Sequence, residues 1–289
     1  MAYNHLSDIE RIERLEKKSF YQIVLEDDMQ QRQVSAESSL KTMRAMYTAM
    51  KEADRSYEAR RRSASGLSGG DGAKLERAVK KGTLISGDFI GTVMEKAVKM
   101  AESNACMKRI VAAPTAGSCG VLPAVLLTYA SFYKCDDNRM VEALYVASGI
   151  GAVIAENASI AGAQGGCQAE IGSGSAMAAG ALTYLRGGDA KQINNAAALA
   201  LKGLLGLVCD PVGGLVEIPC IKRNVIGSVN AVTASDMTIA GIKSAIPADE
   251  VIDAMKNVGK MLPDALKETA CGGLAVTPTA KKLVDKIKK

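Results

Sequence analysis

MVEALYVASGIGAVIA, at residues 140–155, is an apolar run rich in Ala and Gly that lacks the alternation of a half-buried strand. A second run of this kind, AMAAGALTYL, occupies residues 176–185. Small side chains let helices approach one another closely, whereas strands favour aromatic and β-branched residues. Phe, Trp and Tyr together make up only 4% of the chain. We therefore predict an all-α fold.

Helical patterns continue on both sides of these two runs. Residues 4–62 alternate apolar and charged residues at helical spacing without Pro, which predicts two or more amphipathic helices. We divide the chain into a helical N-terminal arm at 1–62 and a single large helical catalytic domain at 63–289. The other predicted helices are 122–133, 193–207, 221–245, 248–261 and one that starts near Ser86, with Ser86 and Asp88 as candidate N-caps.

Composition and charge exclude several classes of protein. The net charge of +5 is modest for 289 residues, and the basic residues are mixed with acidic ones, so we expect no nucleic-acid partner. The charged N-terminus is unlike a secretion signal, and the most apolar segment is shorter than the roughly 20 residues that a bilayer needs. Seven cysteines without periodic spacing argue against a disulfide scaffold. We expect a cytoplasmic protein with no membrane contact.

Three of the cysteines lie in segments punctuated by Gly and Pro: Cys167 in GAQGGCQAEIGSGSAM, Cys209 in GLVCDPVGG and Cys220 in EIPCIKRN. None of the CxxC pairs of zinc ribbons or ferredoxins is present, and a free cysteine is often simply a small buried hydrophobe. The neighbouring Gly and Pro, however, predict tight non-helical backbone at Cys209 and Cys220, where a ligand can come close. Three thiolates without an obvious fourth are what a metal cluster needs if one iron is to stay open for a substrate.

Five ordered blocks resemble the catalytic chain of the iron-sulfur-dependent bacterial L-serine dehydratases. The blocks are SGLSGGDGAKL (65–75), APTAGSCGVLPAVL (113–126), ENASIAGAQGGCQAEIG (156–172), CDPVGGLVEIPCIKRN (209–224) and KETACGGLAVTP (267–278). The resemblance implies a helical catalytic domain and a 4Fe-4S cluster held by Cys167, Cys209 and Cys220. It also implies conversion of L-serine to pyruvate and ammonia, with the open iron acting as a Lewis acid on the leaving hydroxyl. Single-chain members carry a second domain before the catalytic one, so we expect an α chain with a separate β partner.

Two Gly-rich loops are candidate anion sites. The APTAGSCG loop at 113–120 precedes a predicted helix, so its backbone N–H groups and hydroxyls suit a carboxylate, although an ordinary N-cap is an equal alternative. SASGLSGGDG at 63–72 is either a flexible linker or an anion-binding nest. No GK[ST] follows the APTAGSCG loop, which disfavours nucleotide binding there. The candidate substrate contacts are Ser68, Gly69, Thr115, Gly117 and Asn157.

The general base is open on sequence alone, because the only histidine, His5, lies in the charged N-terminal arm. The candidates near the resembling blocks are Glu170, Lys222, Arg223, Glu268 and Ser118. We take Glu170, Arg223 and Ser118 as the catalytic candidates, and Arg223 also suits a bidentate hold on a carboxylate. The structural alternatives are a surface ion pair for Arg223 and an exposed position for Glu170.

Three other functions remain open on the sequence. A cysteine desulfidase would use the same cluster with sulfide as the leaving group, and a non-catalytic sensor would use the cluster only to control association. Cys271 as a fourth ligand would close the cluster or make a structural zinc site. A pyridoxal phosphate enzyme is disfavoured, because we find no matching lysine context or phosphate loop.

Overall fold

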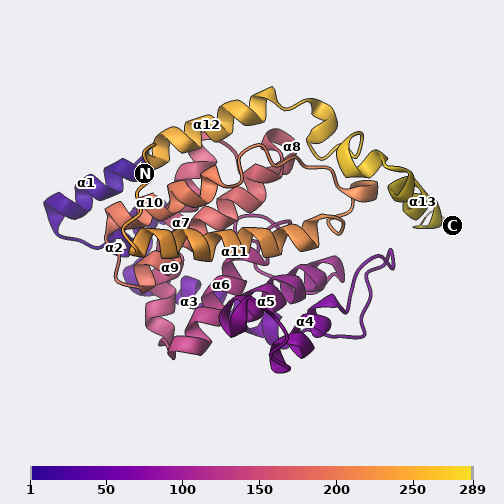
Figure 1. The fold of residues 1–289 in the computed structure, drawn as a ribbon. Helices are drawn as coiled ribbons and strands as arrows, with labels where there is room; N and C mark the ends of the chain where they lie inside the picture. Colours follow the sequence, from indigo (N-terminus) through magenta and orange to yellow (C-terminus); the bar gives the residue numbers. More distant parts are fainter. Residues whose placement is uncertain (1, 288–289) are drawn as a thin grey trace.

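A computed structural model describes residues 2–287, and this range contains helices and turns but no strand. The all-α prediction is confirmed (Figure 1). No described helix combines the length and apolar character of a bilayer span. The α-helices are α1 (Leu6–Glu16), α2 (Phe20–Arg32), α3 (Ala36–Arg55), α4 (Asp71–Lys80), α5 (Gly87–Ala105), α6 (Val121–Tyr133), α7 (Asp137–Asn157), α8 (Gly162–Gly165), α9 (Ser173–Leu185), α10 (Ala190–Lys202), α11 (Cys220–Ile239), α12 (Ala248–Met261) and α13 (Pro278–Ile287). Shorter turns are the π-helical η1 (Gln168–Gly172) and the 3-10 helices η2 (Val212–Gly214), η3 (Asp264–Leu266) and η4 (Gly273–Val276).

Helix α9 is the centre of the fold, because every one of its residues is buried. It packs against α6, α7, α10 and α11, the helices that lie around it in Figure 1. Its sequence, SGSAMAAGALTYL, supplies the small side chains that such crowding needs. A Cβ atom on Gly180 would come within 2.2 Å of Ile150 Cδ1 on α7. Glycine at this position therefore sets how closely α7 and α9 approach.

The N-terminal segment forms three helices, α1 to α3, as the amphipathic pattern predicts. Leu6, Ile9, Phe20 and Tyr47 from these helices lie in the same apolar core as α7 and α9. Burying a large apolar side chain contributes about 1.5–3 kcal/mol, so these helices are stabilised largely by that shared core. The division at residue 62 stays a prediction.

Two helices end earlier than the sequence pattern suggests. Helix α10 ends at Lys202, ahead of the predicted Leu207, and the turn that follows contains Gly206 at φ 82°. Helix α11 ends at Ile239, and Gly241 follows at φ 89°. Apolar periodicity continues past both ends, but glycine in the left-handed region takes the backbone out of the helix.

The prediction of non-helical backbone holds at Cys209 but not at Cys220. Cys209 lies outside any helix, as expected, and forms an isolated bridge with Lys267. Cys220 is instead the first residue of α11, with Pro219 as its N-cap, so the prediction of non-helical backbone is wrong there. Proline lacks an N–H group that the first helical turn leaves unpaired anyway, and it therefore introduces this helix instead of breaking it.

Candidate active site

Three buried thiols come together from separate segments of the chain. Cys167 precedes η1, Cys209 lies between α10 and α11, and Cys220 begins α11. Burial raises the pKa of each thiol to about 12. The charge of Cys220 also raises the pKa of Cys167, that of Cys167 raises the pKa of Cys209, and that of Cys209 raises the pKa of Cys220, so the three groups lie near one another. A thiol with such a pKa is protonated at neutral pH, so a metal that binds here must displace the protons.

Arg223 fixes the backbone around Cys209. Its Nη1 donates to the Val208 carbonyl at 2.8 Å, and its Nη2 lies 2.8 Å from Asp210 Oδ1. The guanidinium therefore holds both neighbours of Cys209 against the helix that Cys220 begins. Its positive charge also lowers the pKa of all three thiols, against the larger effect of burial. A contact between Arg223 and a substrate carboxylate stays a prediction, because both terminal nitrogens already have partners within the chain.

The segment after α12 covers the same loop. Cys209 N donates to the Leu266 carbonyl at 2.9 Å, and Glu268 N donates to the Cys209 carbonyl at 2.8 Å. Leu274 N donates to Asp210 Oδ2 at 2.8 Å. Our sequence analysis missed Asp210, although a charged residue beside a cysteine in an apolar, Gly-rich block was a usable signal. The buried carboxylate joins Arg223 to the C-terminal segment.

Glu170 lies on the π-helical turn η1, a rare element that is frequent at functional sites. It is partly buried, and Thr115 Oγ1 donates to its Oε1 at 2.8 Å. A Cβ atom on Gly117 or Gly162 would lie within 2.9 Å of a carboxylate oxygen, so both glycines make room for this group. Burial raises the pKa of Glu170, the Thr115 hydrogen bond lowers it, and the charge of Glu268 raises it.

The space beside Gly162 also borders a thiol. A Cβ atom there would lie 2.8 Å from Glu170 Oε2 and 3.1 Å from Cys209 Sγ. The lack of a side chain at this position therefore lets the carboxylate and one of the three cysteines lie close to the same backbone atom.

The loop before α6 is tied to α11 through a residue that our sequence analysis missed. Asn224 Oδ1 accepts from Gly120 N, and its Nδ2 donates to the Gly117 carbonyl, both at 2.8 Å. Within the loop, the fully buried Ser118 has its Oγ 3.1 Å from Thr115 Oγ1. The signal for Asn224 was its position one helical turn after a cysteine, which places both side chains on the same face of the helix.

The segment that contains Ser68 and Gly69 packs against the loop between Cys209 and Cys220. Ser68 is buried, and its N and O both bond to Ser63. The hydroxyls of Ser63 and Ser65 donate to the buried Glu217 carboxylate at 2.7 Å each. This carboxylate, which belongs to the cysteine loop, thus anchors the Gly-rich segment beside the site.

At the start of α4, where the Gly-rich segment at 63–72 ends, the backbone N–H groups bind one of the chain's own carboxylates. Asp71 N and Gly72 N donate to the buried Glu102 carboxylate at 2.8 and 3.2 Å. Asn157 is also engaged elsewhere, since its Nδ2 donates to the carbonyls of Asn4 and Val153 at 2.7 and 2.9 Å. Neither group of bonds joins these residues to the three thiols, and the substrate contact at Asn157 stays a prediction.

The remaining cysteines have other surroundings. Cys271 is exposed, and its Sγ donates to the Thr269 carbonyl at 3.2 Å. Cys119 is buried with its Sγ 3.9 Å from the Met100 carbonyl. Within residues 2–287, no three His, Cys, Asp or Glu side chains are arranged to hold a single metal ion. All seven cysteines are free thiols.

The family model described as serine dehydratase alpha chain matches residues 15–275. The chain belongs to the serine dehydratase alpha chain family. A Bacillus subtilis protein named "probable L-serine dehydratase, alpha chain" is 51% identical over 225 residues, which cover 78% of this chain and 75% of the relative. The L-serine dehydratase alpha chain of Peptoniphilus asaccharolyticus is 46% identical over 202 residues, covering 70% and 69%.

The chain also matches longer relatives. The L-serine dehydratase of Streptomyces coelicolor is 48% identical over 182 residues, which cover 62% of this chain but only 40% of the relative. The family match includes the three clustered cysteines, Glu170 and Arg223. The residues that build the site therefore all lie within the part of the chain that defines the family.

Proposed function

We propose that this chain is the catalytic α chain of an L-serine dehydratase, which converts L-serine to pyruvate and ammonia with a 4Fe-4S cluster on Cys167, Cys209 and Cys220. One observation carries the proposal: three buried thiols from three segments lie within electrostatic range of one another, beside the Glu170 carboxylate and the Arg223 guanidinium. The names of the relatives in Bacillus and Peptoniphilus support the substrate.

The donor set fits a cluster better than a single ion. A cubane presents its irons at separate corners, so its cysteines stand farther apart than the ligands of one ion. The three thiolates supply the soft sulfur ligands that iron-sulfur clusters take. Three thiols, with Cys271 exposed, leave one iron without a protein ligand. Glycine at 162 lets the Glu170 carboxylate and Cys209 Sγ lie close to the same backbone position, which places a carboxylate beside one of the three thiols.

When bound, the cluster supplies a Lewis acid for the leaving hydroxyl. Residues of the chain itself carry out the other steps. Glu170 takes the α-proton of serine, because Thr115 holds its Oε1 while no described residue bonds to its Oε2. The N–H group of Gly117 has no acceptor within the described chain and lies just before α6, where it binds the serine carboxylate.

Removal of the α-proton and departure of hydroxide leave aminoacrylate, which tautomerises and hydrolyses to pyruvate and ammonia. The segment after α12 bonds to the Cys209 backbone and holds this side of the site in place. Arg223, on α11, holds the Cys209 loop against this helix through its bonds to Val208 and Asp210.

Single Cys→Ser variants test the proposal. After anaerobic reconstitution with iron and sulfide, Cys167→Ser, Cys209→Ser and Cys220→Ser should each lose the cluster and at least about 99% of pyruvate formation. Cys119→Ser is the matched control, because this thiol is also buried but lies outside the group. Full activity in a variant without iron would reject the cluster, and faster turnover of L-cysteine than of L-serine would make sulfide the leaving group.

A second chain and a cytoplasmic location complete the proposal. The words "alpha chain" in the names of the relatives support a β partner. Seven free cysteines fit a reducing compartment. Full serine dehydration by the purified, reconstituted chain alone would argue against an obligatory β chain.

A further inference from the structure

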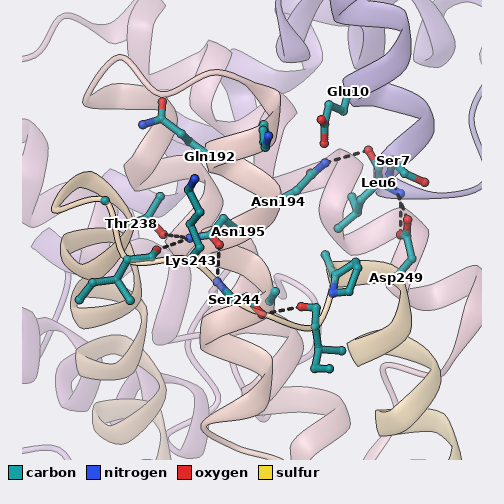
Figure 2. Close-up of a pocket in the computed structure, with 17 residues that line it drawn as sticks. Leu6, Ser7, Glu10, Gln192, Asn194, Asn195, Thr238, Lys243, Ser244 and Asp249 are labelled. Carbon is teal, nitrogen blue, oxygen red and sulfur yellow. Dashed lines mark hydrogen bonds between the residues drawn. The ribbon is translucent and has the colours of Figure 1, made fainter.

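A cavity of about 310 Å³ lies between α1, α10 and the loop that joins α11 to α12 (Figure 2). None of its lining residues belongs to the cysteine site. The beginnings of α1 and α12, which both supply lining residues, lie near each other in Figure 1. Its volume is at the lower end of the range for small-molecule pockets, which run from about 300 to 1,000 Å³.

One wall of the cavity is fixed by the side-chain amide of Asn195 on α10. Its Nδ2 donates to Thr238 Oγ1 at 2.8 Å and to the Ile242 carbonyl at 2.9 Å, while its Oδ1 accepts from Ser244 N at 2.7 Å. Figure 2 shows these bonds converging on one amide. The loop between α11 and α12 is therefore held in place, and the cavity is preformed.

The opposite wall is fixed by bonds to the start of α1. The Asp249 carboxylate accepts from Leu6 N at 2.8 Å and from Ser7 N at 3.1 Å. Asn194 Nδ2 donates to the Leu6 carbonyl at 2.9 Å (Figure 2). Asn194 is only 7% exposed, and its Oδ1 is buried without a hydrogen-bond donor among the described residues. A buried amide oxygen that lacks a donor is costly, so this wall favours a ligand that brings an N–H group.

Three of the charged side chains that line the cavity are available to pair with a ligand. Lys191, Lys243 and Glu10 form no ion pair within residues 2–287, and Figure 2 draws no bond from Lys243 or Glu10. The two ammonium groups belong to α10 and the α11–α12 loop, whereas the carboxylate belongs to α1 beside Asn194. Apolar residues, including Leu6 and Ala198, lie among them.

We infer that this cavity binds a small zwitterion of the α-amino-acid class. The ligand carboxylate pairs with Lys243 and Lys191, and its ammonium group points to Glu10 and the Asn194 wall. A ligand of mixed charge matches the mixed charge of the lining, whereas a polyanion would meet the carboxylates of Glu10 and Asp249. The inference does not depend on the cluster, because no cysteine lines this cavity.

L-Alanine is the probe, since it carries both charges of an α-amino acid but no leaving group at Cβ. Titration calorimetry on the full-length chain should give saturable binding of L-alanine. Propionate lacks the ammonium group and ethylamine lacks the carboxylate, so each should bind at least about tenfold more weakly. Equal binding of propionate and L-alanine, or no saturable binding at all, would overturn the inference.

Single substitutions test whether L-alanine binds in this cavity. Lys243→Gln and Glu10→Gln should each weaken L-alanine at least about tenfold, and Lys81→Gln, an exposed lysine outside the cavity, should leave the affinity unchanged. Cys209→Ser should bind L-alanine as the parent does, which separates this site from the cysteine site. Loss of binding in Cys209→Ser, or full affinity in Lys243→Gln, would overturn the inference. Circular dichroism confirms folding of each variant, and Lys191→Gln provides a second lysine variant.

Discussion

Replacing Gly162 with Ala tests whether the close packing of Glu170 and Cys209 around this glycine is needed for the reaction. The added Cβ would lie 2.8 Å from Glu170 Oε2 and 3.1 Å from Cys209 Sγ, both closer than ordinary van der Waals contact. The carboxylate and the thiol must therefore move by several tenths of an ångström. Overpacking of this kind lowers stability by about 1–3 kcal/mol, and the smaller entropy of the unfolded alanine chain offsets about 0.4–1 kcal/mol of that.

The effect on the reaction should be larger than the effect on stability. A displacement approaching 1 Å at a reacting group lowers a rate by up to about 100-fold, so we expect Gly162→Ala to lose about 10- to 100-fold in pyruvate formation. The free energy of unfolding should fall by only about 1–2 kcal/mol in urea titrations.

Gly172→Ala is the matched control for this variant. Its Cβ would lie 3.7 Å from Leu201 Cδ2, which is an ordinary contact, so activity should be kept. Parent-like activity and iron content in Gly162→Ala would refute the reasoning. Equal losses in the two variants would also refute it, because the effect would then not be specific to the space beside Glu170.

Three further predictions follow from other contacts. Glu170→Gln should keep iron and sulfide but lower pyruvate formation about 10²- to 10⁴-fold at saturating serine, and an unchanged rate would exclude Glu170 as the proton acceptor. Gly180→Ala should lower the free energy of unfolding by about 1–3 kcal/mol in urea, because its Cβ meets Ile150 Cδ1 at 2.2 Å; unchanged stability would contradict the tight contact of α7 and α9. Lys80 and Lys99 lower the pKa of Glu76 from 4.5 to about 2, so its charge stabilises the fold above pH 4.5 and this contribution is lost as the pH falls toward 2. The shift corresponds to about 3 kcal/mol, which screening reduces to about 1 kcal/mol because the side chain is 34% exposed. Glu76→Gln should therefore unfold about 1 kcal/mol more easily at pH 7 but not at pH 2, and an equal difference at both pH values in urea titrations would contradict this.

The sequence predicts the helices of this chain well where local pattern decides them. The bounds of α12 agree with the prediction at both ends, and α6 and α9 begin within a few residues of theirs. The pattern fails at the ends of α10 and α11, where apolar residues continue beyond the helix. Glycines in the left-handed region end these helices, and periodicity does not register backbone conformation.

The site is only partly predictable, because most of its contacts join residues far apart in the sequence. Spacing alone could not show that Cys167, Cys209 and Cys220 come together, and it was the resemblance to a family that grouped them. Asp210 and Asn224 lie within the quoted blocks but act through hydrogen bonds to distant segments. Such bonds depend on how helices pack, which a single sequence does not encode in any local pattern.

Mössbauer spectroscopy of the anaerobically reconstituted chain, with and without L-serine, tests the central claim most directly. If Cys167, Cys209 and Cys220 leave one iron open, the spectrum should resolve a cubane in which L-serine changes the signal of a single iron site. A chain that turns over serine while no iron signal responds to it, or that remains fully active without iron, would contradict the account.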